Sequence, residues 1–251
     1  MKLICYFLDC VTNLHVGDIG DDLSIVDKQV QIDSVTRLPT IFATSLKGAL
    51  RNHCETSMGK ETVNVIFGGE GKTVSQGKFR FLQAQMALYP VPDAESIYRH
   101  ITSPTVRLML GETLALAGGA LDDWLDPDKA HVKLEYLNIG APLVHTLDEV
   151  SDDEMMKAID GLPVVARNQL DNGKSETLWY ENFVPRLTRF LVPLLVPEGA
   201  EDADGKLLSA FEKAICASTG VQIGANATVG YGLCRFTRLA EKPQGGVQHD
   251  R

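Results

Sequence analysis

Apolar positions in the first 60 residues follow strand spacing first and helix spacing afterwards. The mostly apolar run Lys2–Cys10 predicts a buried strand, and the β-branched and aromatic "TIFA" at residues 40–43 predicts a second, short strand. Thr44 or Ser45 can cap a helix that follows directly. The apolar stripe of this helix consists of Leu46, Ala49, Leu50 and Cys54.

The remaining three quarters of the chain continue to mix both spacings. Asp171-Asn172-Gly173 predicts a tight hairpin turn between two strand-like arms. The other expected elements are a strand over 76–91, a strand running into a loop over 105–120, a helix over 148–159, an apolar stretch over 190–196 and a helix over 207–219 that Gly220 ends, with Leu208, Phe211, Ile215 and Cys216 on one face. Because strands and helices alternate without long βαβ repeats, the pattern predicts an α+β fold with one mostly antiparallel sheet.

Charge is distributed unevenly along the 251 residues. Residues 93–160 hold 14 acidic and 5 basic side chains, which accounts for the whole formal net charge of -9. That excess argues against a general nucleic-acid-binding protein. Between Asp27 and Arg51, however, four basic residues face only two acidic ones. We therefore expect an acidic middle segment and a separate face that holds a polyanion.

Cysteine spacing and the N-terminal residues further limit the kinds of protein that this chain can be. The five cysteines are odd in number and include no CxxC pair, so neither a disulfide framework nor a zinc site is expected. The N-terminal apolar run stops at Asp9, which is too early for a signal peptide or a membrane span. We expect a cytoplasmic protein without membrane contact.

Several motifs taken singly permit a structural explanation. "GGEGKT" at residues 68–73 lacks the first glycine of a phosphate-binding loop, because Ile66 stands there. His15, in a Gly-rich loop, is either a general base or a hydrogen-bonding loop residue. Gly224, Gly230 and Gly232 suit a backbone that must approach a neighbour or an RNA closely. The hairpin aromatics Trp179, Tyr180 and Phe183 are either core residues or a wedge against bases.

The order of these motifs resembles the RAMP superfamily of CRISPR effector proteins. The sequence is most similar to the backbone subunits of type III-B (Cmr) complexes. The segments that carry the resemblance are "LHVG", "IVDKQVQIDSVTRLPTI", "SLKGALR", "FGGEGKTVSQGKFRF", "ITSPTV", "LWYENFVP" and "IGANATVGYGLCRF", which together span Leu14 to Phe236.

This resemblance implies a fold and a domain organisation. The fold would be a ferredoxin-like, RRM-related palm that carries a β-hairpin thumb and further insertions. Residues 1–240 would form a single RAMP domain, with the thumb at about Val164–Pro185, an acidic insertion at about residues 93–160 and a disordered tail over 241–251.

The resemblance also implies a function. Copies of the chain would line up in a filament on a CRISPR guide RNA, beside other CRISPR effector subunits, and would cleave target RNA at regular intervals. Asp27 would be both catalytic residue and ligand of a divalent metal ion, Mg or Mn. The guide would be bound by Ser45, Lys47, Arg51 and the three glycines, and the thumb aromatics would interrupt the guide–target duplex.

Two departures from the family pattern bear on this function. Lys28 follows Asp27, and a cation there would lower the pKa of the carboxyl and compete with a metal. Ala43-Thr44 precedes "SLKG" where the family commonly has Gly or Ser. Asp33, the second carboxylate of the basic stretch, is expected to close the turn "DSVT".

Two alternative functions therefore stay open. One is a catalytically inactive, structural RNA-binding backbone subunit. The other is a metal-independent endonuclease that processes the guide RNA with His15 as its base. Replacement of Asp27 separates cleavage from the first alternative, and EDTA separates it from the second.

Overall fold

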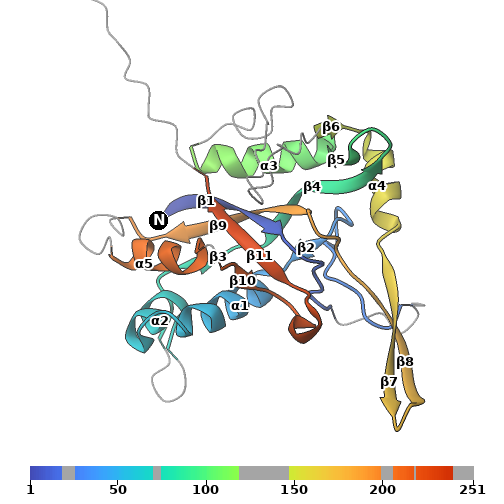
Figure 1. The fold of residues 1–251 in the computed structure, drawn as a ribbon. Helices are drawn as coiled ribbons and strands as arrows, with labels where there is room; N and C mark the ends of the chain where they lie inside the picture. Colours follow the sequence, from blue (N-terminus) through green and yellow to red (C-terminus); the bar gives the residue numbers. More distant parts are fainter. Residues whose placement is uncertain (19–25, 70–74, 119–146, 199–205, 218, 240–251) are drawn as a thin grey trace, which may run out of the picture.

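A nine-stranded, mostly antiparallel sheet is the centre of the computed structural model, which describes residues 1–18, 26–69, 75–118, 147–198, 206–217 and 219–239 (Figure 1). Its main path runs β10-β11-β1-β9-β4-β5-β6, with β2 paired to β4 and β3 paired to β9. The strands are β1 (Lys2–Cys10), β2 (Thr40–Ile41), β3 (Arg80–Phe81), β4 (Ala84–Asp93), β5 (Ile97–Thr102), β6 (Leu147–Glu149), β9 (Arg189–Val196), β10 (Val221–Gln222) and β11 (Leu233–Arg238). The predicted α+β class with one mostly antiparallel sheet is confirmed.

Strand β1 lies between β9 and β11 and is buried along almost its whole length. Tyr6 is opposite Val192 on one side and Arg238 on the other, and both pairings are antiparallel. Neighbours on both edges satisfy its backbone hydrogen bonds, so its mostly apolar side chains can be buried. The buried strand that the apolar run Lys2–Cys10 predicted is thus confirmed.

Two groups of helices flank the sheet (Figure 1). The helices α1 (Ala43–Glu55), α2 (Lys60–Phe67) and α5 (Lys206–Ile215) pack together at one end. Phe211 of α5 is the centre of this contact, with its ring 5.6–6.1 Å from those of Phe67, Phe79 and Phe81. The helices α3 (Pro104–Leu116) and α4 (Asp152–Asp160) lie at the other end, beside β4, β5 and β6 (Figure 1).

The predicted strand over 105–120 is wrong, because this segment is helix α3. Ser103 caps it by accepting a hydrogen bond from the Val106 N–H, and Pro104 occupies the first turn, where a missing N–H costs nothing. Val106, Leu110 and Leu114 then recur every four residues on the buried face. This cap and this period were the overlooked signals.

Other boundaries also shifted. Helix α1 begins at Ala43 with Phe42 as its cap residue, so the predicted capping by Thr44 or Ser45 is wrong. The predicted strand over 76–91 is divided into β3 and β4. Helix α4 starts at Asp152, where Ser151 and Glu154 form a capping box, because residues 147–149 form β6. Cys216 follows the end of α5 and is exposed.

The hairpin predicted at Asp171-Asn172-Gly173 is confirmed. Strands β7 (Val164–Asp171) and β8 (Lys174–Asn182) form a separate two-stranded sheet that projects from the rest of the described structure (Figure 1). Asn172 and Gly173 have φ of 49° and 80°, as a two-residue primed turn requires. Directly paired residues share a face, so Ala166, Asn168, Leu178 and Tyr180 lie on one face and Arg167, Trp179 and Glu181 on the other.

Some expectations fall outside the described residues. They concern the tail over 241–251, the part of the acidic insertion over 119–146 and most of the "GGEGKT" motif. Within the described part of the chain, no helix is both long and apolar enough to span a bilayer.

The C-terminal glycines provide a matched pair for a stability test. Gly230 and Gly232 both have positive φ, 84° and 80°, but a Cβ at Gly230 would meet open space whereas one at Gly232 would lie 2.0 Å from the Ile223 carbonyl oxygen. We predict that Gly230→Ala lowers the free energy of unfolding by about 1–2 kcal/mol, the backbone cost alone. Gly232→Ala should lower the free energy of unfolding by more than about 4 kcal/mol. Urea unfolding followed by circular dichroism tests this, and equal losses would show that the close approach is unimportant.

Candidate RNA-cleavage site at the base of the hairpin

The segment Val26–Val30, here called the Asp27 segment, lies along the outer edge of β8. The Lys28 N–H donates to the Tyr180 carbonyl oxygen and the Asn182 N–H donates to the Lys28 carbonyl oxygen, both at 3.1 Å. The bridge between Lys28 and Glu181 is parallel. The segment therefore acts as a third strand at the base of the hairpin, although 153 residues separate Asp27 from Tyr180.

Asp27 is exposed, yet its carboxylate is oriented. Its Oδ2 accepts a hydrogen bond of 2.7 Å from the Tyr180 backbone N–H. An exposed carboxylate held at one oxygen keeps lone pairs of the other directed to solvent. The predicted catalytic residue is thus placed at the root of a projecting hairpin, with room beside it for a large polyanion.

Lys28 is directed away from a pairing with Asp27. Its Nζ lies over the indole ring of Trp179, 4.6 Å from the ring centroid. Cations are attracted to the negative face of an indole. The ammonium that was expected to compete with a metal at Asp27 is therefore occupied by a neighbouring aromatic ring.

A buried ionic cluster forms the base of the hairpin. Glu181 is 1% exposed and accepts hydrogen bonds of 2.8 Å from the Arg167 Nε and from the Asn226 amide. Burial is the largest influence and raises the pKa of Glu181, but hydrogen bonding and charge from Arg167, with smaller contributions from Trp179 and His15, give a net lowering. Glu181 is thus an ionised carboxylate that ties both hairpin arms to the C-terminal Gly-rich loop.

Neither Glu181 nor Arg167 was singled out from the sequence. The available signal was a charged residue in each arm of a strongly aromatic hairpin, since a charge in a buried strand position requires a partner. The pairing itself could not be predicted, because it joins diagonal neighbours across a two-stranded sheet.

His15 is buried rather than presented to solvent. It is 3% exposed, and its Nδ1 lies 2.7 Å from the Asn182 carbonyl oxygen. A carbonyl oxygen can only accept, so Nδ1 carries the proton in this contact. The structure therefore places His15 as a support beneath the Asp27 segment, in keeping with the hydrogen-bonding alternative for this residue.

The predicted guide-binding residues of α1 have different surroundings. Lys47 is exposed. Arg51 is engaged within the chain: its guanidinium donates to the Glu55 carboxylate, the Gly68 carbonyl oxygen and the Asn64 side-chain oxygen at 2.8–2.9 Å. These contacts tie α1 to α2, so Arg51 has a structural role that the motif did not indicate.

Ser45 is held by a glutamine that the sequence analysis missed. Gln31 is 4% exposed, and its Nε2 donates to the Ser45 Oγ at 2.8 Å and to the Gly17 carbonyl oxygen at 3.2 Å. Its Oε1 accepts from the Phe42 N–H at 2.7 Å, which replaces a side-chain cap on α1. Gln31 thereby links the start of α1 to the segment that carries Asp27.

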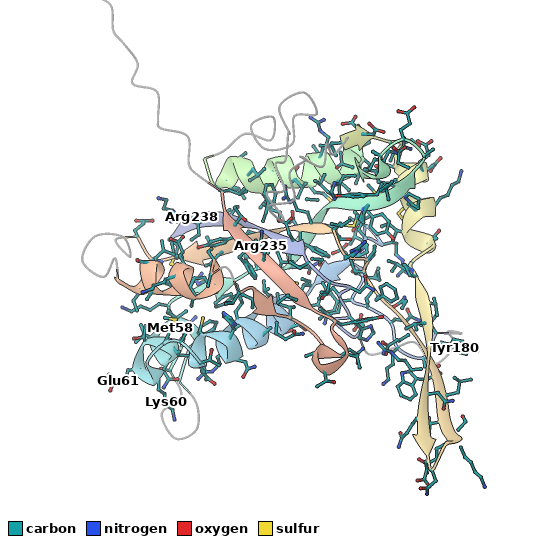
Figure 2. The ribbon with its side chains drawn as sticks, in the orientation of Figure 1. Met58, Lys60, Glu61, Tyr180, Arg235 and Arg238 are labelled. Atoms are coloured by element: carbon teal, nitrogen blue, oxygen red, sulfur yellow. The ribbon has the colours of Figure 1, made fainter. Side chains whose placement is uncertain are left out.

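The three predicted guide-binding glycines differ in their surroundings, and so do the three predicted thumb aromatics. Gly224 and Gly232 are required by contacts with the chain's own backbone at His15 and Ile223, whereas Gly230 borders open space. Trp179 faces Lys28, and Phe183 packs edge-on against Tyr231 at 5.5 Å. Only Tyr180 of the three aromatics is exposed, on the projecting hairpin (Figure 2).

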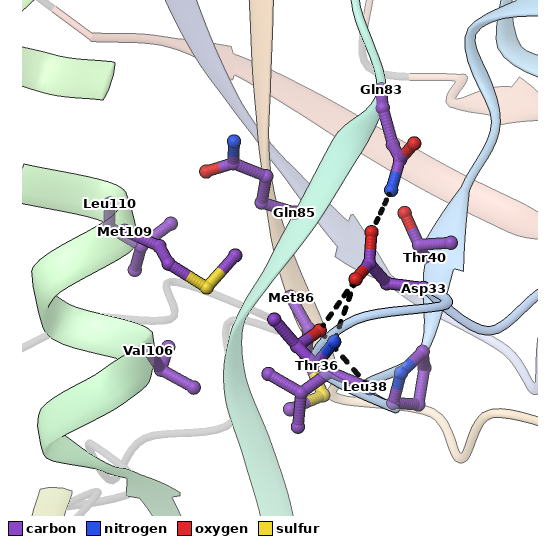
Figure 3. A pocket seen from close by; sticks show the side chains of 11 residues that line it. Asp33, Thr36, Leu38, Thr40, Gln83, Gln85, Met86, Val106, Met109 and Leu110 are labelled. Atoms are coloured by element: carbon purple, nitrogen blue, oxygen red, sulfur yellow. Dashed lines mark hydrogen bonds between the residues drawn. The ribbon is translucent and has the colours of Figure 1, made fainter. Parts of the chain in front are cut away.

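Asp33 closes its turn as predicted. Its Oδ1 accepts from the N–H groups of Val35 and Thr36 and from the Thr36 hydroxyl, and its Oδ2 accepts from the Gln83 amide. The Thr36 backbone bond contributes most to a lowered pKa of Asp33. The same turn borders a small hollow against α3 (Figure 3), which does not include Asp27.

The side chains that surround Asp27 bear on how a metal ion could be held there. The described residues contain no cluster of three or more His, Cys, Asp or Glu side chains suited to a metal ion. A single carboxylate does fit a magnesium ion whose other ligands are waters and substrate phosphate oxygens, a common arrangement for this ion. Asp27, with one oxygen directed to solvent, is such a carboxylate.

Comparison with known proteins identifies the family. The model of the RAMP superfamily matches residues 7–235. The chain belongs to the RAMP superfamily. The family predicted from the order of the motifs is thus confirmed over nearly the whole chain, and the Asp27 segment, α1, the hairpin and the Gly-rich loop all lie within the match.

Individual relatives agree with this assignment. A Pyrococcus furiosus protein named CRISPR system Cmr endoribonuclease Cmr4 is 27% identical over 296 aligned residues, which cover 99% of each chain. A chain of the type III-B Cmr-beta complex bound to cognate target RNA has a TM-score of 0.74 at 20% identity, with 95% and 97% of the two chains covered. Oligomeric Cmr4 of Pyrococcus furiosus has a TM-score of 0.67 at 22% identity, covering 96% of this chain and 100% of that one. The shared fold covers 95–96% of this chain in these two comparisons.

Lys47 and Arg51 permit a test of which basic residue on α1 contacts RNA. We predict that Arg51→Ala lowers the free energy of unfolding by about 1–3 kcal/mol, because it removes charged hydrogen bonds to α2. Lys47→Ala should change it by less than about 0.5 kcal/mol, but should reduce the salt slope of guide binding by about one phosphate contact. Urea unfolding and filter binding at several salt concentrations measure both. A reduced slope in a fully stable Arg51→Ala variant would place Arg51 on the RNA instead.

Proposed function

We propose that this RAMP protein is a guide-RNA-binding backbone subunit of a type III-B CRISPR complex and cleaves target RNA at regular intervals. The observation that carries the proposal is the exposed, oriented carboxylate of Asp27 at the root of the projecting hairpin. The full-length relative named Cmr endoribonuclease supports it. The match to a chain in a complex bound to target RNA supports the same assignment by its fold.

The proposed chemistry follows from this placement. A hairpin that displaces a base leaves the neighbouring nucleotide unstacked, and its ribose 2′-hydroxyl can then attack the adjacent phosphate in line, a geometry that a regular duplex forbids. The attack would form a 2′,3′-cyclic phosphate and break the bond to the 5′-oxygen of the next nucleotide, which would leave as a hydroxyl with the proton given up by the 2′-hydroxyl or one from water. Asp27 would lie beside that phosphate and hold a Mg or Mn ion, which would offset the charge that develops on the phosphate oxygens. Without such an ion, the carboxylate would repel the RNA.

The remaining surfaces have complementary roles in this proposal. Lys47, Ser45 and the exposed Gly230 would contact the guide, and Tyr180 with Leu178 would press against the duplex from the exposed face of the hairpin. Copies of the chain would follow one another along the guide, next to other effector subunits, in the cytoplasm. The oligomeric Cmr4 of Pyrococcus furiosus supports self-assembly.

We further infer that the palm is ferredoxin-like. The strands β11-β1-β9-β4 are neighbours in this order, and all their pairings are antiparallel. In the chain, α1 lies between β1 and β4 and α5 lies between β9 and β11, and the two helices pack together. This matches a βαββαβ arrangement. On this basis the hairpin, α3, α4 and β5–β6 are additions to a palm, with the hairpin as the thumb.

Asp27 is the residue on which cleavage should depend. We predict that Asp27→Asn in an assembled complex leaves guide content and target affinity unchanged but lowers target cleavage by at least about 100-fold. EDTA should have the same effect on the wild type, and added Mg or Mn should restore cleavage. A labelled target RNA analysed on a denaturing gel measures the rate. Cleavage that persists in Asp27→Asn would assign the chemistry to other residues, and cleavage that persists in EDTA would favour a metal-independent nuclease.

The tip of the hairpin should set the spacing of the cuts. Deletion of residues 168–175 would leave Glu176–Leu178 to close a shorter loop between Arg167 and Trp179. We predict that this variant folds and retains most guide binding, but that the regular ladder of target cuts is lost because no element displaces the bases. The readout is the pattern of cuts on an end-labelled target. A ladder with unchanged spacing would show that another element interrupts the duplex.

A further inference from the structure

Strand β8 determines where the Asp27 carboxylate lies. Four hydrogen bonds fix the Asp27 segment against this strand: two between Lys28 and the backbone of Tyr180 and Asn182, one from the Val30 N–H to the Asn182 side-chain oxygen, and one from the Tyr180 N–H to Asp27 itself. Two of these bonds join backbone groups alone, so other side chains would permit them equally. Beside Asp27, the contact between two side chains of these strands is Lys28 over Trp179.

The Trp179 ring is fixed from the palm side. It lies on the same face of the hairpin as Arg167 and Glu181 and is half-buried there. Its indole N–H donates weakly, at 3.5 Å, to the Glu181 carboxylate, which Asn226 and Arg167 hold in place. Lys28 thus binds to a ring that is itself supported by the buried ionic cluster.

We propose that Trp179 and Lys28 act together as positioning residues for Asp27, an inference that rests on the proposed cleavage function. The cation–π contact holds the Asp27 segment in register on β8, so that the Asp27 carboxylate meets the Tyr180 N–H. Trp179 therefore serves the cleavage step from the base of the hairpin, while Tyr180 and Leu178, on the opposite face, remain available to the duplex.

This role differs from the two that the sequence alone suggests for these residues. A base-stacking Trp179 would require a ring open to the RNA, but its face is covered by the Lys28 ammonium. A competing Lys28 would require its ammonium at the Asp27 carboxylate, but the ring holds it 4.6 Å from the indole centroid. The three roles predict different kinetics.

The test measures single-turnover cleavage by assembled complexes at saturating target, together with target affinity. An exposed cation–π pair corresponds to roughly a two- to fivefold effect on a local equilibrium. Lys28→Met and Trp179→Leu should each slow cleavage by about this factor, and the double variant should be no slower than either single one. Guide content and target affinity should stay at wild-type values. Lys28→Arg and Trp179→Phe, which keep a cation and an aromatic face, should retain most of the rate.

Leu178→Ala is the matched control for the hydrogen-exchange measurement alone, since Leu178 is next to Trp179 in the chain but on the other face and 56% exposed. Hydrogen exchange of a peptide that includes residues 26–30 should speed up in Lys28→Met and Trp179→Leu and remain unchanged in Leu178→Ala.

Each contrary result has a definite meaning. Weaker target binding by Trp179→Leu at an unchanged cleavage rate would make Trp179 a base-stacking residue and overturn the inference. A faster rate in Lys28→Met would overturn it in favour of a competing ammonium, and additive losses would show that the two residues do not act together. Unchanged rates and exchange in both variants of a cleaving complex would overturn the inference alone. A wild-type complex that binds target without cutting it would overturn the proposed function and this inference with it.

Discussion

The pairing of the Asp27 segment with β8 is the contact on which the candidate site depends. It joins residues 153 positions apart in the chain and uses mainly backbone groups. Among the described residues, the Tyr180 N–H at this strand edge is the group that holds the Asp27 carboxylate. The orientation of the exposed Asp27 carboxylate therefore depends on the base of the hairpin. Any change that shifts β8 also shifts Asp27.

The hairpin base can bear this role because it is anchored by charge. Glu181 and Arg167 form an ion pair in which the carboxylate is 2% exposed, with Asn226 as a further donor. A buried pair of this kind adds little net stability, but loss of one partner leaves an uncompensated charge at considerable cost. The pair therefore fixes one docking geometry for the base.

Residues of one motif have different surroundings in the structure, and side-chain type does not reveal the difference. Lys47 and Arg51 lie four residues apart on α1, yet Lys47 is exposed while Arg51 ties α1 to α2. Gly230 and Gly232 have nearly the same backbone conformation, yet only Gly232 is pressed against the chain's own backbone. Similar motifs in relatives can thus be retained for packing as well as for binding.

The sequence alone determined the elements whose signals are local. The apolar run of β1, the Asn172-Gly173 turn, the apolar stripe of α1 and the turn at Asp33 were predicted because each depends on residues close together in the chain. The order of motifs was enough to predict the RAMP family. Helix α3 was mispredicted although its signal was also local: the Ser103 cap and the four-residue period were overlooked.

Tertiary structure decided the partners of the charged and polar side chains. The contact of Lys28 with Trp179, the bond of His15 to Asn182, the bond of Arg51 to Gly68 and the bond of Gln31 to Ser45 each join different segments of the chain. A sequence shows that such a residue needs a partner, because an unpaired buried polar group is costly. Which partner it meets depends on how the strands and helices pack, and that is fixed only when the whole chain has folded.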